Sequence, residues 1–176
     1  MTLWGGRFAE EPEASLWSFT AATDDRRLLA DDIAGSVAHV GMLMEVGLLA
    51  QEEGASLTAG LTALAAEAEA GQFEFAETDE DVHTAVERRL IELVGPVGAK
   101  LHTGRSRNDQ IALDLRLYLT RAAGDRIGQL RALAGALLDQ AEAVGEQVVA
   151  AYTHLQQSQA VTLGHYLLAH AWPLLR

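Results

Sequence analysis

The sequence predicts a nearly all-α fold. Hydrophobic residues make up 49% of the 176 residues, and Ala and Leu dominate them, while β-branched and aromatic residues are sparse, which favours helices over strands. Apolar residues also recur at helical spacing along most of the chain. The length suits one domain with its own core, since domains typically contain roughly 50 to 250 residues.

Residues 1–20 show no helical periodicity, and we expect an extended arm there. From about Arg27 to Leu49 the apolar residues follow a helical pattern. Ser56 resembles the N-cap of a second, short amphipathic helix that ends near Gly71.

Thr78 and Asp81 have the spacing of a capping box, with Asp in place of the more usual Glu. They predict a helix over residues 79–94. Gly95 and Pro96 should end it, because proline cannot continue a helix and glycine favours its C-terminus.

Asn108 or Asp109 can cap a long fourth helix, in which apolar residues recur every three to five positions over about 40 residues. Such a helix greatly exceeds the mean length of about 11 to 12 residues. Its Leu and Ala stripe should be covered by other chains, which predicts an oligomer. Residues 150–157 form a polar interruption before a last apolar helix, and because Arg176 lies within that pattern without a C-cap signal we expect a truncated chain.

The formal charge of −12 makes nucleic-acid binding a poor prediction, because a phosphate backbone repels such a chain. Local groups of arginines can still bind a small anion. The absence of cysteine excludes disulfides, Cys-ligated zinc and a thiol nucleophile. No secretory signal or membrane-spanning stretch is recognisable, so a soluble, cytoplasmic protein that does not bind membranes is expected.

The strongest candidate site is His102 to Gln110, HTGRSRNDQ. A glycine-containing loop that enters a helix presents backbone N–H groups and the positive end of the helix dipole, which favour an anion. Arg105 and Arg107 add positive charge. The alternative is structural: Thr103, Ser106 and Asn108 cap the helix while the arginines pair with acidic residues.

Two further segments carry weaker signals. His154, within Thr153 to Gln156, is a candidate acid or base because histidine exchanges a proton near neutral pH. His83 should lie close to Asp79 and Glu80 on the helix surface, where it could bind a metal, but the spacing matches no strong ligand motif. We therefore interpret these acids as complements of the helix dipole. His165 and His170 lack the four-residue spacing of a helical metal site. We predict no metal and no cofactor.

Read together, these segments resemble argininosuccinate lyase, within the superfamily of fumarase, aspartase, adenylosuccinate lyase and the δ-crystallins. The matching motifs occur in the family's order: WGGRF at 4–8, DEDVHTAVERRL at 79–90, KLHTGRSRNDQ at 100–110 and YTHLQ at 152–156. The resemblance implies reversible elimination of argininosuccinate to arginine and fumarate, in arginine biosynthesis or the urea cycle. It also implies an amino-terminal helical domain over residues 1–107 and the start of a fumarase/aspartase-type helical bundle over residues 108–176.

By the same resemblance, His154 occupies the acid/base histidine position. The implied substrate contacts are Asn108, Thr153, Arg107, Ser106 and Asp81, with Thr23 in place of a serine of the arm. The family's GSSxMPxK loop, which carries a catalytic serine, is missing, so we expect this chain to be inactive alone. Each active site of the family combines three subunits of a homotetramer. A crystallin-like structural protein or an inactive truncated homologue is the alternative.

Overall fold

The computed structural model describes residues 13–22 and 24–176. Two compact units divide the chain after Tyr118. The chain is predominantly helical, as predicted, and the strands within the described residues form one antiparallel pair. The domain boundary expected at residue 107 remains a prediction.

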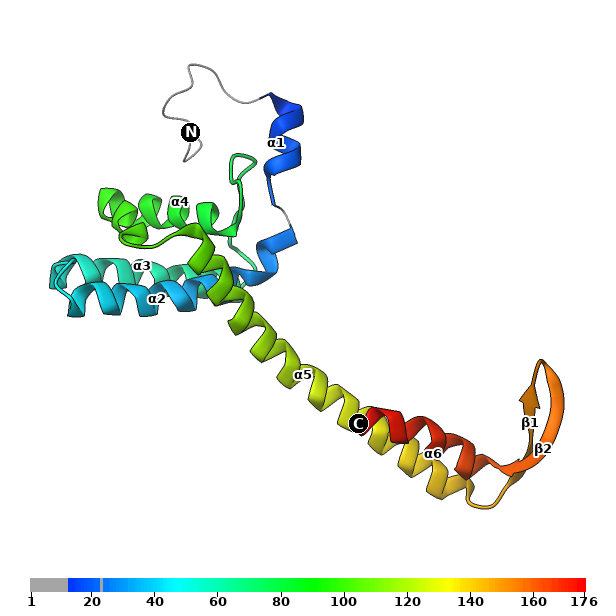
Figure 1. Cartoon of the computed structure of the whole chain (residues 1–176). Helices are drawn as coiled ribbons and strands as arrows, with labels where there is room; N and C mark the ends of the chain where they lie inside the picture. Colours follow the sequence, from blue (N-terminus) through cyan, green and yellow to red (C-terminus); the bar gives the residue numbers. More distant parts are fainter. Residues whose placement is uncertain (1–12, 23) are drawn as a thin grey trace. The chain divides into compact units, whose positions relative to one another are not determined.

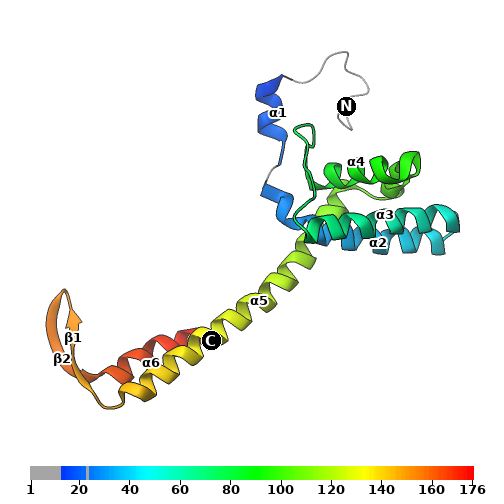
Figure 2. The ribbon, with the colours of Figure 1, turned by 180° about the vertical axis from the view of Figure 1, so that it is seen from behind.

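The first unit is built on three helices, α2 (Leu29–Glu45), α3 (Gln51–Glu69) and α4 (Val82–Val94), which pack against one another in both views (Figures 1 and 2). Their facing sides form the core. Each fully buried Leu or Val contributes roughly 1.5 to 3 kcal/mol. The core residues are Ile33, Val40, Leu43, Leu49, Leu57, Leu61, Leu64, Val86, Leu90 and Leu101.

Short elements connect these helices. A helix, α1 (Ala14–Thr20), lies within the segment that we expected to be an extended arm, so that prediction is wrong for those residues. The WGGRF motif lies outside the described residues. Two 3-10 helices, η2 (Asp24–Leu28) and η3 (Gly95–His102), precede α2 and follow α4.

Two predicted helix starts were wrong. Helix α3 begins at Gln51, five residues before Ser56, and Glu53 Oε2 accepts a hydrogen bond from the Ala50 backbone N–H. Helix α4 is capped by Asp81 instead of Thr78, because the Asp81 carboxylate accepts from the Thr84 N–H at 2.7 Å. Its predicted end at Gly95 is confirmed.

The long helix is confirmed as α5 (Arg107–Val144), which has 38 residues. The expected caps, Asn108 and Asp109, were misplaced. Ser106 precedes the helix, and its Oγ accepts from the Asn108 N–H at 3.2 Å, while Asp109 Oδ2 accepts from the Ser106 N–H at 2.9 Å. This reciprocal arrangement is a variant of the capping box, in which the hydroxyl accepts from the second helical residue instead of the third.

In the second unit, the polar interruption is a β-hairpin of β1 (Val148–Thr153) and β2 (Gln156–Thr162). Helix α6 (Leu163–Leu174) follows and lies beside the end of α5 (Figure 1). Gly164 allows this approach, because a Cβ there would lie 2.9 Å from the Gly145 carbonyl oxygen. None of the helices in the described part of the chain could span a membrane.

Candidate functional site

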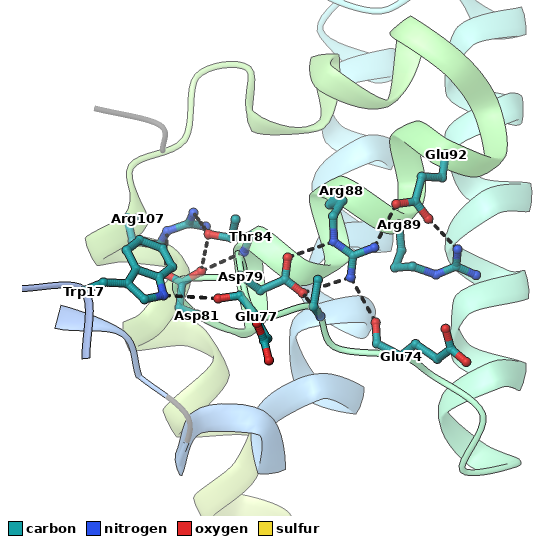
Figure 3. A network of polar contacts seen from close by, with 11 residues as sticks. Trp17, Glu74, Glu77, Asp79, Asp81, Thr84, Arg88, Arg89, Glu92 and Arg107 are labelled. Carbon is teal, nitrogen blue, oxygen red and sulfur yellow. Dashed lines mark hydrogen bonds and ion pairs between the residues drawn. The ribbon is translucent and has the colours of Figure 1, made fainter. Parts of the chain in front are cut away.

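Arg107, the first residue of α5, is held by three partners from the first unit. Its Nε pairs with Asp81 Oδ2 at 3.1 Å, and its Nη2 donates to Thr84 Oγ1 at 3.3 Å, as Figure 3 shows. Its Nη1 donates to Gln110 Oε1 at 3.1 Å. A guanidinium has five N–H groups, so these contacts leave two, the number that a bidentate carboxylate accepts.

Asp81 connects the starts of α4 and α5. One carboxylate oxygen, Oδ1, accepts both the Thr84 N–H and the Thr84 hydroxyl at 2.7 Å, and Oδ2 pairs with Arg107. The structure therefore brings Arg107 and Asp81 together. Asp81 thus contacts Arg107 directly and occupies one side of its guanidinium.

Ser106 and Asn108 lie beside Arg107 and are exposed. The Ser106 hydroxyl serves the helix cap, in agreement with the structural alternative for that residue. The Asn108 side chain lies on the exposed surface of the first turn of α5. Arg107 is compatible with both interpretations of the loop. It pairs with an acidic residue, Asp81, as the structural alternative expects, and it still has N–H donors for an anion.

His102 and Arg105 contribute to the charge of this loop. Burial lowers the pKa of His102, and the positive charge of Arg107 lowers it further, which favours the neutral imidazole. Burial also lowers the pKa of Arg105, although the charges of Asp32 and Asp114 oppose this effect. Arg105 Nη1 donates to Ser36 Oγ at 3.2 Å.

A buried cluster of Asp32, His83 and Asp114 lies beneath the loop. His83 Nδ1 lies 2.9 Å from Asp32 Oδ1 and 3.4 Å from Asp114 Oδ2. All three are at most 2% exposed. His83 is thus buried between α2 and α5, which corrects the expectation that it lies on the helix surface near Asp79 and Glu80.

The pKa values of the two carboxylates of this cluster are shifted in opposite directions. Burial opposes the charge of Asp32, but the hydrogen bond and charge of His83 outweigh it, so the pKa of Asp32 lies below its ordinary value. Burial and the negative charge of Asp32 raise the pKa of Asp114 to about 7. Asp114 therefore takes up a proton first as the pH falls.

The cluster also has the composition of a cation site, with ligand atoms within 4.8 Å of one another. Arg105 places a positive charge near both carboxylates and lowers the pKa of each. Sequence reasoning missed Asp32 and Asp114. A sequence signal for buried polar residues did exist, because a polar residue on the apolar face of a helix stands out. Gln110 and Asp114, four positions apart on one face of α5, give such a signal.

A second polar network holds the segment before α4 (Figure 3). Arg88 binds Asp79 through Nε and Nη2 at 2.8 and 2.9 Å, and donates to the Glu74 carbonyl oxygen at 2.9 Å. Hydrogen bonds from Arg88 to Asp79 and Glu92 raise the pKa of Arg88 above its ordinary value. Asp79 is thus an ion-pair partner instead of the expected dipole complement.

Thr153 and His154 lie in the second unit, at the tip of the β-hairpin. His154 and Leu155 have φ angles of 52° and 61°, which are left-handed values that non-glycine residues seldom adopt. Both side chains are exposed, Leu155 at 94%. Such strain concentrates at functional sites. Thr23 lies outside the described residues.

Comparison with known proteins identifies the family. A family model described as Lyase matches residues 6–176. The chain belongs to this lyase family. It is 52% identical to the argininosuccinate lyase of Roseiflexus sp. (strain RS-1) over 99% of its length, and 46% identical to that of Bacillus subtilis (strain 168). The chain spans 38% of the length of each of these relatives.

Two solved structures have a similar fold. An EDDS lyase variant with bound fumarate is 30% identical, with a TM-score of 0.66 over 90% of this chain and 31% of that one. A fumarate lyase:delta crystallin from Brucella melitensis has a TM-score of 0.69 at 17% identity over 88% of this chain and 40% of that one, a likeness of fold alone.

Proposed function

We propose that this chain forms the amino-terminal part of an argininosuccinate lyase, which reversibly eliminates fumarate from argininosuccinate to release arginine. The observation that carries the proposal is the 52% identity to the Roseiflexus enzyme over 99% of the chain. The anchored guanidinium of Arg107, with two N–H groups left for a carboxylate, supports it chemically.

The reaction removes a proton from the carbon beside a carboxylate and expels a guanidinium nitrogen from the neighbouring carbon. Negative charge develops on that carboxylate, so fixed donors stabilise the transition state. In this proposal Arg107, Asn108 and Thr153 bind substrate carboxylates or polar groups, with Ser106, Asp81 and Thr23 nearby. His154 acts as acid or base.

The proposal includes a cytoplasmic homotetramer. Large apolar side chains lie exposed along α5, and exposed apolar surface of this kind marks protein contacts. They include Ile111, Leu115, Leu119, Ile127, Leu130, Leu133 and Leu138. Sedimentation analysis of the protein expressed from the complete reading frame tests the tetramer.

The activity is tested by following the ultraviolet absorbance of fumarate with the protein from the complete reading frame and with the 176-residue chain. We expect turnover from the former and none from the latter. Arg107→Ala should lower kcat/KM by about 100-fold or more, as expected when a charge-assisted contact to substrate is lost. Arg126→Ala, which removes an exposed arginine from the same helix, is the matched control.

An inactive complete protein that still assembles would contradict the proposal and favour the crystallin-like structural alternative. Equal activity of the Arg107→Ala and Arg126→Ala variants would leave the lyase assignment intact and remove Arg107 from the site.

A further inference from the structure

Gln110 lies between Arg107 and the buried cluster. It is 3% exposed. Its Oε1 accepts from Arg107 Nη1 at 3.1 Å, and its Nε2 donates to Asp32 Oδ1 at 2.5 Å. We propose that Gln110 is a positioning residue, which fixes the orientation of the Arg107 guanidinium by linking it to Asp32 of the buried Asp32–His83–Asp114 cluster. The inference rests on the proposed function, in which Arg107 binds a substrate carboxylate.

Only certain side chains can make this connection. An arginine offers donors alone, and an ionised carboxylate offers acceptors alone. The residue between Arg107 and Asp32 must therefore accept on one side and donate on the other, as an amide does. This requirement also defines the orientation of the Gln110 amide. A hydrocarbon side chain makes neither contact, and an ionised carboxylate makes only the contact to Arg107.

Asp32 is a firm anchor for the amide. It is fully buried on α2, and the oxygen that accepts from Gln110 also lies 2.9 Å from His83 Nδ1. Gly35, one turn further along α2, permits this close packing, because a Cβ there would lie 3.1 Å from the Leu113 side chain. Helices α2, α4 and α5 thus meet at one carboxylate oxygen.

Gln110 supplies the contact to Arg107 that the start of α4 does not. Asp81 and Thr84 hold Nε and Nη2, whereas Nη1 is held by Gln110 from within α5. The side chain of Arg107 is 23% exposed, so without Gln110 its outer nitrogen would turn toward solvent. The two N–H groups left for substrate would then lose their direction.

The test compares Gln110→Met with Gln110→Glu in the protein from the complete reading frame. Gln110→Met should raise KM for argininosuccinate by about 10-fold at every pH. A protonated carboxyl both accepts and donates, so Gln110→Glu should behave as wild type at low pH and lose affinity as the introduced group ionises. We expect this loss between about pH 5 and 8, because burial and the charge of Asp32 favour the neutral acid while Arg107 favours the ionised form.

Charged or ionisable groups from three helices face Gln110 and its partners, so each variant is compared with wild type at the same pH. These groups are Asp32 from α2, Asp81 and His83 from the start of α4, and Arg105, Arg107 and Asp114 from the loop and α5. The matched control is Gln129→Glu. Gln129 accepts from Arg126 at the same three-residue spacing on α5 but is exposed, and its replacement should leave the pH profile unchanged.

A second measurement does not depend on turnover. In ¹⁵N NMR spectra of the 176-residue chain, the Arg107 Nη1–H signals, assigned with Arg107→Lys, should be sharp in wild type and broadened in Gln110→Met, because Gln110 holds this nitrogen. In Gln110→Glu they should broaden reversibly as the pH rises. A sharp signal in both variants, or unchanged KM values, would overturn the positioning role. An inactive wild type with the predicted NMR changes would overturn the proposed function alone.

Discussion

The replacement Asp114→Asn tests the electrostatics of the buried cluster. Asp114 is 1% exposed, and burial together with the charge of Asp32 raises its pKa from 3.8 to about 7. The folded state therefore binds this proton more tightly than the unfolded state does. The resulting stabilisation is complete below about pH 4 and is lost as the pH rises to about 7.

The magnitude follows from the same values. A rise from 3.8 to about 7 corresponds to a loss of roughly 4 kcal/mol between low pH and pH 8, of which about 3 kcal/mol falls between pH 5 and pH 8. Asn is neutral and of similar shape, so it avoids this loss. Relative to wild type, Asp114→Asn should gain about 3 kcal/mol of stability when the pH is raised from 5 to 8.

Urea unfolding followed by circular dichroism at both pH values measures the difference. Asp24→Asn, at an exposed carboxyl of the same unit, controls for the general effect of removing a negative charge. The reasoning would be refuted if Asp114→Asn and wild type lost equal stability between the two pH values. It would also fail if Asp24→Asn gave the same gain.

Two further predictions concern the backbone. Gly98→Ala should destabilise the first unit by about 1 to 3 kcal/mol, because its Cβ would lie 2.8 Å from the backbone N and Cα of Ile91; urea unfolding checks this, and an unchanged midpoint would contradict it. Leu155→Gly should stabilise the hairpin by up to about 1 kcal/mol, since glycine adopts a φ of 61° without the steric cost to leucine. Hydrogen exchange at the Thr153 and Gln156 amides should then slow about two- to five-fold, and faster exchange would count against the strain.

The sequence was most informative where a pattern is long and local. The apolar repeat of α5 extends over 38 residues, and Gly95 with Pro96 ends α4 through backbone chemistry that no tertiary contact has to supply. The hairpin over residues 148–162 escaped prediction because its strands are largely exposed. They therefore lack the alternation of apolar and polar residues that identifies a half-buried strand.

Only the part of the candidate site that lies in short polar segments could be predicted from the sequence. Arg107 belongs to a loop whose dense polar composition marks it as a candidate site, whereas Asp81 was placed in the site only by the family resemblance. Asp32 and His83 become neighbours only when α2 packs on α4, over a separation of 51 residues. The role of Gln110 depends on that packing as well, because its amide contacts Asp32 across 78 residues.

The two oxygens of Asp81 have a consequence for the interpretation of inherited or engineered substitutions. One oxygen caps the start of α4 and the other holds Arg107. If Arg107 binds substrate as proposed, a change at this position disturbs folding and ligand binding together. The loss of an N-cap alone costs about 0.5 to 2 kcal/mol. A low yield of such a variant would therefore not identify it as a folding mutant, nor would a high KM identify it as a binding mutant. Only measurements on the residual folded fraction separate the two defects.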